Sequence, residues 1–255
     1  MTDVFITSAI RTGVGSFSGS LSSLQAHDLG KVVIKDSLKK SSVESSEVDE
    51  VIFGQVLSAG TGQNPARQAS MNAGIDKETP AYVVNQVCGS GLRTVALGFQ
   101  SIKNQDANIV IAGGQESMSQ SPHCMHLRSG TKMGDTKMID TMIKDGLWDA
   151  FNGYHMGTTA ENVAEQFQIT REQQDEFAYN SQLKASKAKA EGLFKDEITP
   201  VEIVTKKETI VFDQDEYIKD NVQLEKLASL RPAFSKDGSV TCLLYTSDAA
   251  DDTCC

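Results

Sequence analysis

The sequence lacks both a membrane-spanning run and a recognisable leader. No stretch of about 18 consecutive apolar residues occurs in the 255 residues, so no transmembrane helix is predicted. The start, Met1-Thr2-Asp3, has neither the basic and apolar regions of a secretory signal nor the arginine-rich character of a mitochondrial presequence. Lys and Arg number 24 against 34 Asp and Glu, and the net charge of -10 argues against a general nucleic-acid binder.

Cysteine is also scarce. The five cysteines, an odd number, show no paired framework, and only the terminal Cys254-Cys255 has a spacing that could suggest metal ligands. We therefore expect no metal site and a reducing compartment, which makes the protein cytoplasmic. The hydrophobic content of 39% allows a sizeable core and one or two domains.

The first half of the chain alternates short apolar strands with helical stretches. Strands are expected at 4–9, 51–57, 81–87 and 107–113, and helices over 24–40, 65–73 and 92–102. Pro65 suits the first turn of its helix. Alternation at this period predicts an α/β fold, with a mostly parallel sheet covered by helices on both faces.

The character changes after about residue 118. Residues 119–153 have no clear periodicity and are expected to form an extended loop, in which Met133, Met138 and Met142 fill gaps in packing. Helices are expected over 159–167 and 171–191, and strands over 197–204 and 209–212. Thr170, with a glutamine three residues later, has the pattern of a capping box for the second helix.

Cys88 is the strongest candidate for chemistry. A β-branched run leads into Cys88-Gly89-Ser90-Gly91, and the apolar residues that follow share one helical face: Leu92, Val95, Ala96, Phe99 and Ile102. The thiol is therefore expected at a strand-to-helix turn, where the unpaired N–H groups of the helix favour a thiolate nucleophile. The alternative is a small buried hydrophobe in a strand-helix crossover.

Five segments resemble motifs of the thiolase family, the enzymes that make or cleave 3-ketoacyl-CoA thioesters. The nucleophile motif is Asn85-Gln86-Val87-Cys88-Gly89-Ser90-Gly91-Leu92. The other four segments are 4–12 (with Gly15 and Phe17), 113–119, 154–162 and 230–234, and all five occur in family order. The resemblance is collinear from Thr2 to about Thr241.

The resemblance implies a thiolase-like amino-terminal α/β domain over residues 1–118 and a loop domain covering the CoA site over 119–241, with the second α/β domain missing. It implies an acyltransferase that condenses two acetyl-CoA into acetoacetyl-CoA and CoA, or catalyses the reverse thiolysis, through an acyl-Cys88 intermediate. Coenzyme A is then a moiety of the substrates, and no cofactor is implied. Residues 126–128, 144–147 and 155–156 resemble the acetoacetyl-CoA branch of the family.

Four further residues are implied as substrate contacts. Leu147 would touch the pantetheine arm of CoA, and His155 with Met156 would line the acyl pocket, biasing it toward short or 2-methyl-branched chains. Lys219 stands where relatives often carry an arginine against the adenine or the phosphates; it keeps the charge but loses planar stacking. Without the resemblance, His155 would be interpreted as a packed loop residue.

The chain departs from the family at about Thr241. Residues 242–255 continue no upstream pattern and look like translated non-native sequence, such as adapter or vector read-through. A prenylation signal at Cys254-Cys255 is the alternative, but no basic stretch precedes it. In the family, the histidine base, the second cysteine and a water-positioning asparagine lie in a second half that these residues do not include. We therefore expect this chain alone to be inactive in the full reaction, and the helix after Cys88 to lack its packing partner.

Three functions stay open at this point. The chain belongs to an acetoacetyl-CoA-forming enzyme, to a degradative 3-ketoacyl-CoA thiolase for longer chains, or is a non-catalytic fragment that binds CoA or a thiolase subunit. Family members are dimers or tetramers, and the loop over 128–145 resembles one used for tetramer contacts. No nucleic acid or membrane partner is expected.

Overall fold

The computed structural model describes residues 3–245 and contains two compact units. Unit 1 comprises Met1–Gly146 and Asp196–Gln214, and unit 2 comprises Leu147–Lys195 and Asp215–Cys255. The domain boundaries expected at residues 118 and 241 stay a prediction. From residue 246 onward, the expected non-native tail, with the Cys254-Cys255 pair, lies outside the described residues.

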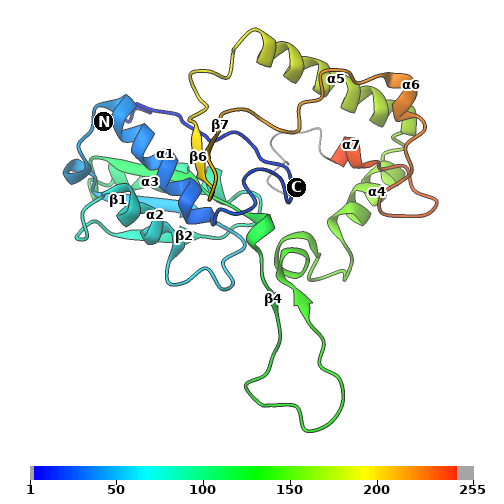
Figure 1. The fold of residues 1–255 in the computed structure, drawn as a ribbon, viewed down its shortest axis with the longest axis horizontal. Helices are drawn as coiled ribbons and strands as arrows, with labels where there is room; N and C mark the ends of the chain where they lie inside the picture. Colours follow the sequence, from blue (N-terminus) through cyan, green and yellow to red (C-terminus); the bar gives the residue numbers. More distant parts are fainter. Residues whose placement is uncertain (1–2, 246–255) are drawn as a thin grey trace. The chain divides into compact units, whose positions relative to one another are not determined.

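A three-stranded parallel sheet forms the centre of unit 1, in the order β2-β1-β3 (Figure 1). The strands are β1 (Glu50–Gly54), β2 (Ala81–Val84) and β3 (Val110–Gly114). Gly54 pairs with Val84 on one side and with Gly114 on the other, so the carboxyl ends of the three strands are level. The predicted parallel sheet is confirmed, although its strands are shorter than the apolar runs that encode them.

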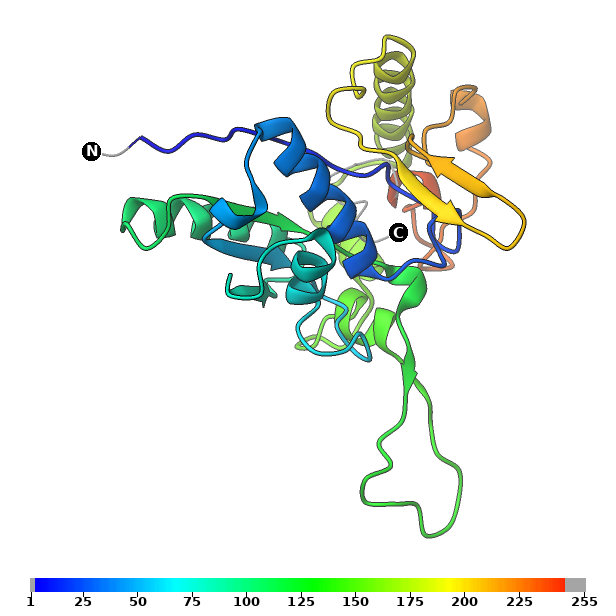
Figure 2. The ribbon, with the colours of Figure 1, turned by 60° about the vertical axis from the view of Figure 1, so that its left-hand side comes forward.

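Helices cover both faces of this sheet: α1 (Ala26–Ser41), α2 (Pro65–Ala73) and α3 (Ser90–Lys103). Val51 and Phe53 of β1 lie in a core with Ile34 of α1 and with the alanines of α2, and α1 crosses over that side of the sheet (Figure 2). Ile52 and Gly54 point to the opposite face, toward α3, because successive strand residues alternate. The helices expected over 24–40, 65–73 and 92–102 are confirmed.

Small residues of α3 make its contact with the sheet. Ser90, Thr94 and Gly98 are buried, and the hydroxyl of Thr94 donates to the carbonyl oxygen of Gly113 at 2.9 Å. The large apolar residues are exposed instead: Leu92 78%, Val95 40% and Phe99 51%. The predicted helix is confirmed. Its small residues face the sheet and its apolar stripe does not, because only small side chains allow the helix to approach β1 and β3 this closely. An exposed apolar face of this kind is typical of an interface.

The segment before α1 differs from expectation. Residues 4–9 form no strand within the described part of the chain, and Phe5 and Ile6 are 78% and 79% exposed. The nearest pairing is a single bridge between Arg11 and Ile198. An apolar run becomes a strand only where a neighbouring strand receives its backbone hydrogen bonds, and residues 3–245 offer this run none.

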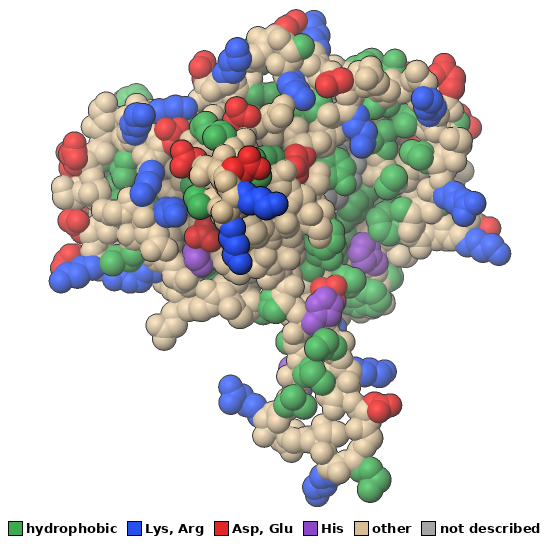
Figure 3. Space-filling view, viewed as in Figure 1, with side chains coloured by type: hydrophobic (Ala, Val, Ile, Leu, Met, Phe, Trp, Pro, Cys, Tyr) green, Lys and Arg blue, Asp and Glu red, His purple; other side chains and the backbone are tan. Residues whose placement is uncertain are grey.

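A hairpin extends from unit 1 between β4 (His123–Cys124) and β5 (Ile139–Asp140), as Figure 1 shows. Hydrophobic side chains occur along its loop in the space-filling view of Figure 3. Met133 and Met138 are 95% and 63% exposed, so the expectation that they fill gaps in packing is wrong. The loop extends away from the core, which leaves these residues no cavity to fill.

The remaining elements of unit 1 are shorter. The 3-10 turn η2 (Met118–Gln120) precedes the hairpin, and the π-helix η3 (Met142–Leu147) follows it, with its last residue in unit 2. The two predicted strands are confirmed as β6 (Val201–Val204), which begins later than expected, and β7 (Thr209–Phe212). They pair in an antiparallel arrangement, and Val201, Ile203 and Phe212 pack against Leu21.

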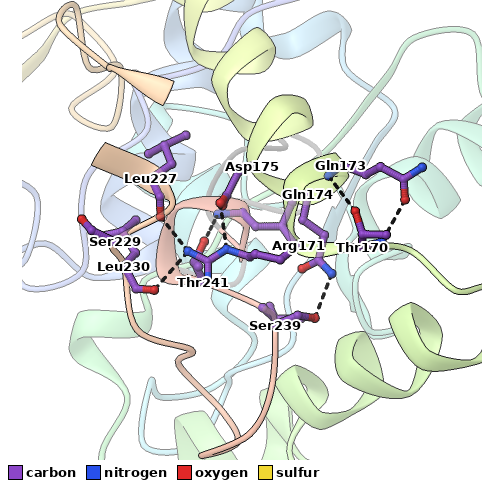
Figure 4. A network of polar contacts seen from close by, with 12 residues as sticks. Thr170, Arg171, Gln173, Gln174, Asp175, Leu227, Ser229, Leu230, Ser239 and Thr241 are labelled. Carbon is purple, nitrogen blue, oxygen red and sulfur yellow. Dashed lines mark hydrogen bonds and ion pairs between the residues drawn. The ribbon is translucent and has the colours of Figure 1, made fainter. Parts of the chain in front are cut away.

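Unit 2 is helical, with α4 (Met156–Gln166), α5 (Arg171–Ala190), α6 (Leu224–Leu227) and α7 (Cys242–Tyr245). The predicted capping box is confirmed: the Thr170 hydroxyl accepts the backbone N–H of Gln173 at 3.3 Å, and the Gln173 side chain accepts the N–H of Thr170 at 2.8 Å (Figure 4). Ala178, Leu227 and Leu243 form the buried core. Among residues 3–245, no helix is long and apolar enough to cross a membrane.

Inside unit 2, Arg171 forms an ion pair within α5 and also joins this helix to the end of α6 and the residues that follow it (Figure 4). The Arg171 guanidinium donates to the Asp175 carboxylate at 2.8 Å, and to the carbonyl oxygens of Leu227 and Leu230 at 2.6 and 3.0 Å. The Asp175 side chain is only 6% exposed. A buried carboxylate needs such a partner because burial removes it from water.

Candidate active site

Cys88 lies in an exposed turn between β2 and α3. β2 ends at Val84, and α3 begins at Ser90, so residues 85–89 make the connection. The Cys88 side chain is exposed and forms no disulfide. The predicted position at a strand-to-helix turn is confirmed, and the alternative of a buried small hydrophobe is wrong.

The turn before Cys88 contains an unusual backbone. Val87 has a φ of +50°, in the left-handed region that β-branched residues rarely adopt. The Asn85 side chain accepts the N–H of Val87 at 3.0 Å. The hydroxyl of Ser90 accepts the N–H of Gln86 at 2.8 Å and donates to the carbonyl oxygen of Val87 at 2.6 Å. Asn85 and Ser90 are inside the 85–92 motif, but nothing in the sequence assigned them a role.

Glycine at the end of β1 lets α3 come close. A Cβ added to Gly54 would lie 2.6 Å from the carbonyl carbon of Ser90 and 2.7 Å from the backbone nitrogen of Gly91. Only glycine fits such a contact between backbones. The first turn of α3 therefore rests directly on the carboxyl end of the sheet, which is where open α/β sheets place their ligands.

Gln115 and Glu116, which follow β3, hold the segment after β1 at the carboxyl edge of the sheet. The Glu116 carboxylate accepts the N–H groups of Val56 and Leu57 at 2.8 and 3.2 Å. Burial raises the pKa of Glu116, and these backbone hydrogen bonds partly oppose that rise. Gln115 donates to the side chain of Gln55 at 2.8 Å. The edge beside the Cys88 turn is thus ordered by polar contacts between strands distant in the sequence.

Three of the four predicted substrate contacts lie near one another in unit 2. Trp148 and His155 form an antiparallel bridge, which brings Leu147 and Met156 to the same turn. Leu147 is 5% exposed, whereas His155 and Met156 are half-buried. Cys88 is in unit 1, so it belongs to a different compact unit from these residues.

His155 begins helix α4. Its Nδ1 accepts the N–H of Gly157 at 2.9 Å, so it acts as the N-cap and carries its proton on Nε2. Its ring stacks on Phe234 with centroids 5.2 Å apart. A Cβ on Gly157 would collide with the Phe234 ring, so glycine makes room for this stack. Phe234 closes the 230–234 motif, but sequence reasoning gave it no role.

Lys219 lies elsewhere in unit 2, against α5. Its backbone N–H donates to the buried side chain of Gln182 at 2.8 Å, while its own side chain is exposed, with Nζ 6.0 Å from the centre of the Tyr217 ring. An exposed ammonium on an ordered backbone could meet a phosphate. Within residues 3–245, no group of three or more His, Cys, Asp or Glu side chains could hold a metal ion.

We expect unit 2 to lose stability as the pH falls below about 6.5, because burial lowers the pKa of His155 from its ordinary value of 6.5. The unfolded chain therefore binds a proton on His155 more tightly than the folded chain does. The contribution of neutral His155 is therefore complete above pH 6.5 and is lost as the pH falls through the lowered pKa. The urea midpoint, followed by Trp148 fluorescence from about pH 5 to about pH 7.5, measures this.

His155→Asn is the control for that prediction. Asparagine is a good N-cap that does not titrate, so this variant should show a flatter dependence on pH in the same window. A dependence as steep as that of the unaltered chain would assign the effect to other groups.

The chain is similar to known proteins over nearly all of its length. A family model described as "Thiolase, N-terminal domain" matches residues 4–248. An acetyl-CoA acetyltransferase of Rhizobium meliloti (strain 1021) is 60% identical over 238 residues, which are 93% of this chain and 61% of that protein. One from Shinella zoogloeoides is 57% identical over 240 residues, covering 94% of this chain and 61% of that protein.

A solved structure supports the same relationship. The crystal structure of the Bacillus anthracis acetyl-CoA acetyltransferase superposes with a TM-score of 0.90 at 38% identity, covering 93% of this chain and 60% of that one. The chain therefore spans about three fifths of the length of the relatives it matches, at their amino-terminal part. The resemblance drawn from the five motifs is confirmed, and the family match continues past Thr241.

Proposed function

Because the chain belongs to the thiolase family, we propose that it is the nucleophile-bearing part of an acetyl-CoA acetyltransferase. The proposed reaction joins two acetyl-CoA into acetoacetyl-CoA and CoA, or runs in reverse as thiolysis. The observation that carries the proposal is the exposed Cys88 thiol at the turn that opens α3. The names of the similar proteins support the short-chain reaction over the longer-chain degradative one.

In the proposed first step, the sulfur of Cys88 attacks the carbonyl carbon of acetyl-CoA. The acetyl group becomes a thioester on Cys88, and the CoA sulfur leaves and takes up the proton that the Cys88 thiol gave. In the second step, the α-carbon of another acetyl-CoA loses a proton and attacks that thioester. This releases acetoacetyl-CoA, and the displaced sulfur of Cys88 takes up a proton in turn, which restores the thiol. The backbone N–H of Cys88 is proposed as one donor to the developing oxyanion.

The other predicted residues would bind the substrate. We assign Leu147 to the pantetheine arm, His155 and Met156 to the acyl pocket, and Lys219 to the phosphates of CoA. The neutral His155 and its stacking with Phe234 support the assignment, because an uncharged, packed ring suits an acyl chain.

The chain spans about three fifths of the length of these relatives, which favours an activity narrower than the full two-step reaction for this chain by itself. We propose that the 255 residues take up an acetyl group on Cys88 but do not condense it with a second acetyl-CoA. Self-association as a dimer or tetramer is proposed as well, supported by exposed apolar residues on the hairpin loop: Met125, Leu127, Met133 and Met138. The cytoplasmic location, and the expectation of neither a nucleic acid nor a membrane partner, stay predictions from composition.

Mass spectrometry of the intact chain after incubation with acetyl-CoA tests the proposal. One acetyl group should appear, and peptide mapping should place it on Cys88 and not on any of the other four cysteines. Cys88→Ser should remove it, because the serine hydroxyl is a much weaker nucleophile. An unmodified chain, or equal labelling of Cys88 and the other four cysteines, would refute the role of Cys88.

A further inference from the structure

The backbone of Val87 is held in a conformation that its own side chain opposes. A φ of +50° brings a β-branched residue into crowding that glycine would avoid. Burial does not compensate, because Val87 is 52% exposed. Such a residue keeps this conformation only where surrounding contacts enforce it. Val87 immediately precedes Cys88, so whatever holds Val87 also sets the direction of the thiol.

The hydroxyl of Ser90 is the group placed to enforce it. It accepts the N–H of Gln86 at 2.8 Å and donates to the carbonyl oxygen of Val87 at 2.6 Å, so one atom joins the peptide group before Gln86 to the peptide group after Val87. Ser90 itself is 4% exposed, and its backbone rests against Gly54. The exposed turn is therefore tied to a buried point on the sheet. The Asn85 side chain adds a third hydrogen bond, from the N–H of Val87.

We propose that Ser90 is a positioning residue for Cys88: its hydroxyl holds the turn at Val87 and thereby directs the thiol toward the carbonyl of a bound acyl-CoA. The part about acyl-CoA rests on the proposed function, whereas the part about the turn does not. Ser90 takes no part in bond making. It acts by keeping the sulfur in an orientation from which attack requires no rearrangement.

The first experiment measures the coupling between positions 87 and 90 by urea unfolding of the full chain. Val87→Gly relieves the backbone crowding, so the unfolding equilibrium constant should fall roughly fivefold. In a Ser90→Ala background the turn can relax, and the same substitution should change the constant less than about twofold. Equal effects in the two backgrounds would overturn the proposal.

The second experiment separates positioning from reactivity. Ser90→Ala should slow acetylation of Cys88 at saturating acetyl-CoA by roughly 10- to 100-fold, because that step needs an oriented sulfur. Alkylation of Cys88 by iodoacetamide needs no bound complex and should change less than about threefold. Ser101→Ala, in the last turn of the same helix, is the control and should change neither rate. Equal losses in both reactions would indicate general damage and overturn the proposal.

Asn85→Ala provides a second variant if Ser90→Ala folds poorly. It removes a hydrogen bond from the same turn at an exposed position, and it should slow acetylation more than alkylation. If the unaltered chain is not acetylated, the proposed function fails, while the coupling between positions 87 and 90 still decides whether Ser90 holds the turn.

Discussion

Replacing Gly54 with alanine is expected to lower the free energy of unfolding of unit 1 by about 2–3 kcal/mol and to slow acetylation of Cys88 roughly 100-fold. The new Cβ would lie 2.6 Å from the carbonyl carbon of Ser90 and 2.7 Å from the nitrogen of Gly91. Those are backbone atoms, which cannot rotate aside as a flexible side chain can. The first turn of α3 must shift away from the sheet, and Cys88 moves with it.

Hydrogen exchange of the amides in β1 and α3 measures the loss of stability, and mass spectrometry measures the acetylation. Gly91→Ala is the matched control, because a Cβ there meets nothing within 4 Å. Alanine in place of this helical glycine should stabilise α3 by about 0.5–1 kcal/mol. If the amide hydrogens of β1 and α3 exchanged at the same rate in the Gly54→Ala variant as in the unaltered chain, the close contact between β1 and α3 would be refuted.

Replacing Arg171 with alanine should lower the free energy of unfolding of unit 2 by about 3–5 kcal/mol. The substitution leaves the Asp175 carboxylate, 6% exposed, without its guanidinium partner. It also removes the donor to the carbonyl oxygens of Leu227 and Leu230. The chain's one tryptophan, Trp148, belongs to unit 2, so urea unfolding followed by its fluorescence measures the effect.

An exposed ion pair on the same helix provides the control. Lys187 lies 3.8 Å from Glu191, with the two side chains 75% and 52% exposed, and Lys187→Ala should cost less than about 0.5 kcal/mol. The double variant Arg171→Met with Asp175→Leu should recover much of the stability lost in Arg171→Ala, because no charge then remains buried. If Arg171→Ala cost no more than Lys187→Ala, burial would not be what makes this pair matter.

The elements that were predicted correctly from the sequence are encoded by residues that lie close together along the chain. Pro65 begins α2, and Thr170 with Gln173 begins α5, because a cap satisfies N–H groups of the same helix turn. The parallel sheet followed from the alternation of short apolar runs with helices, since parallel strands need crossover connections. The strand-to-helix turn at Cys88 was predictable for the same local reason.

The errors share a different cause. Phe5 and Ile6 have a strand-like pattern, but a strand also requires a neighbour that its own residues do not supply. Met133 is apolar, yet its exposure depends on where the hairpin extends. On α3 the pattern correctly indicated a helix, but it did not indicate that Ser90, Thr94 and Gly98 are the residues that pack on the sheet. In each case the hydrophobic pattern describes one segment alone, whereas burial depends on that segment and on the one that packs against it.

The sequence by itself determined the helices, the parallel strands, the family and the position of Cys88 in a turn, because hydrophobic period, caps and motif residues act over short distances along the chain. Only the tertiary structure decided the strained backbone of Val87, the buried hydroxyl of Ser90 beneath it, and the tautomer of His155. Those properties arise where a residue meets the groups that surround it in the fold. The approach of β1 to α3 at Gly54 involves a partner 36 positions away along the chain, and no local pattern encodes that contact.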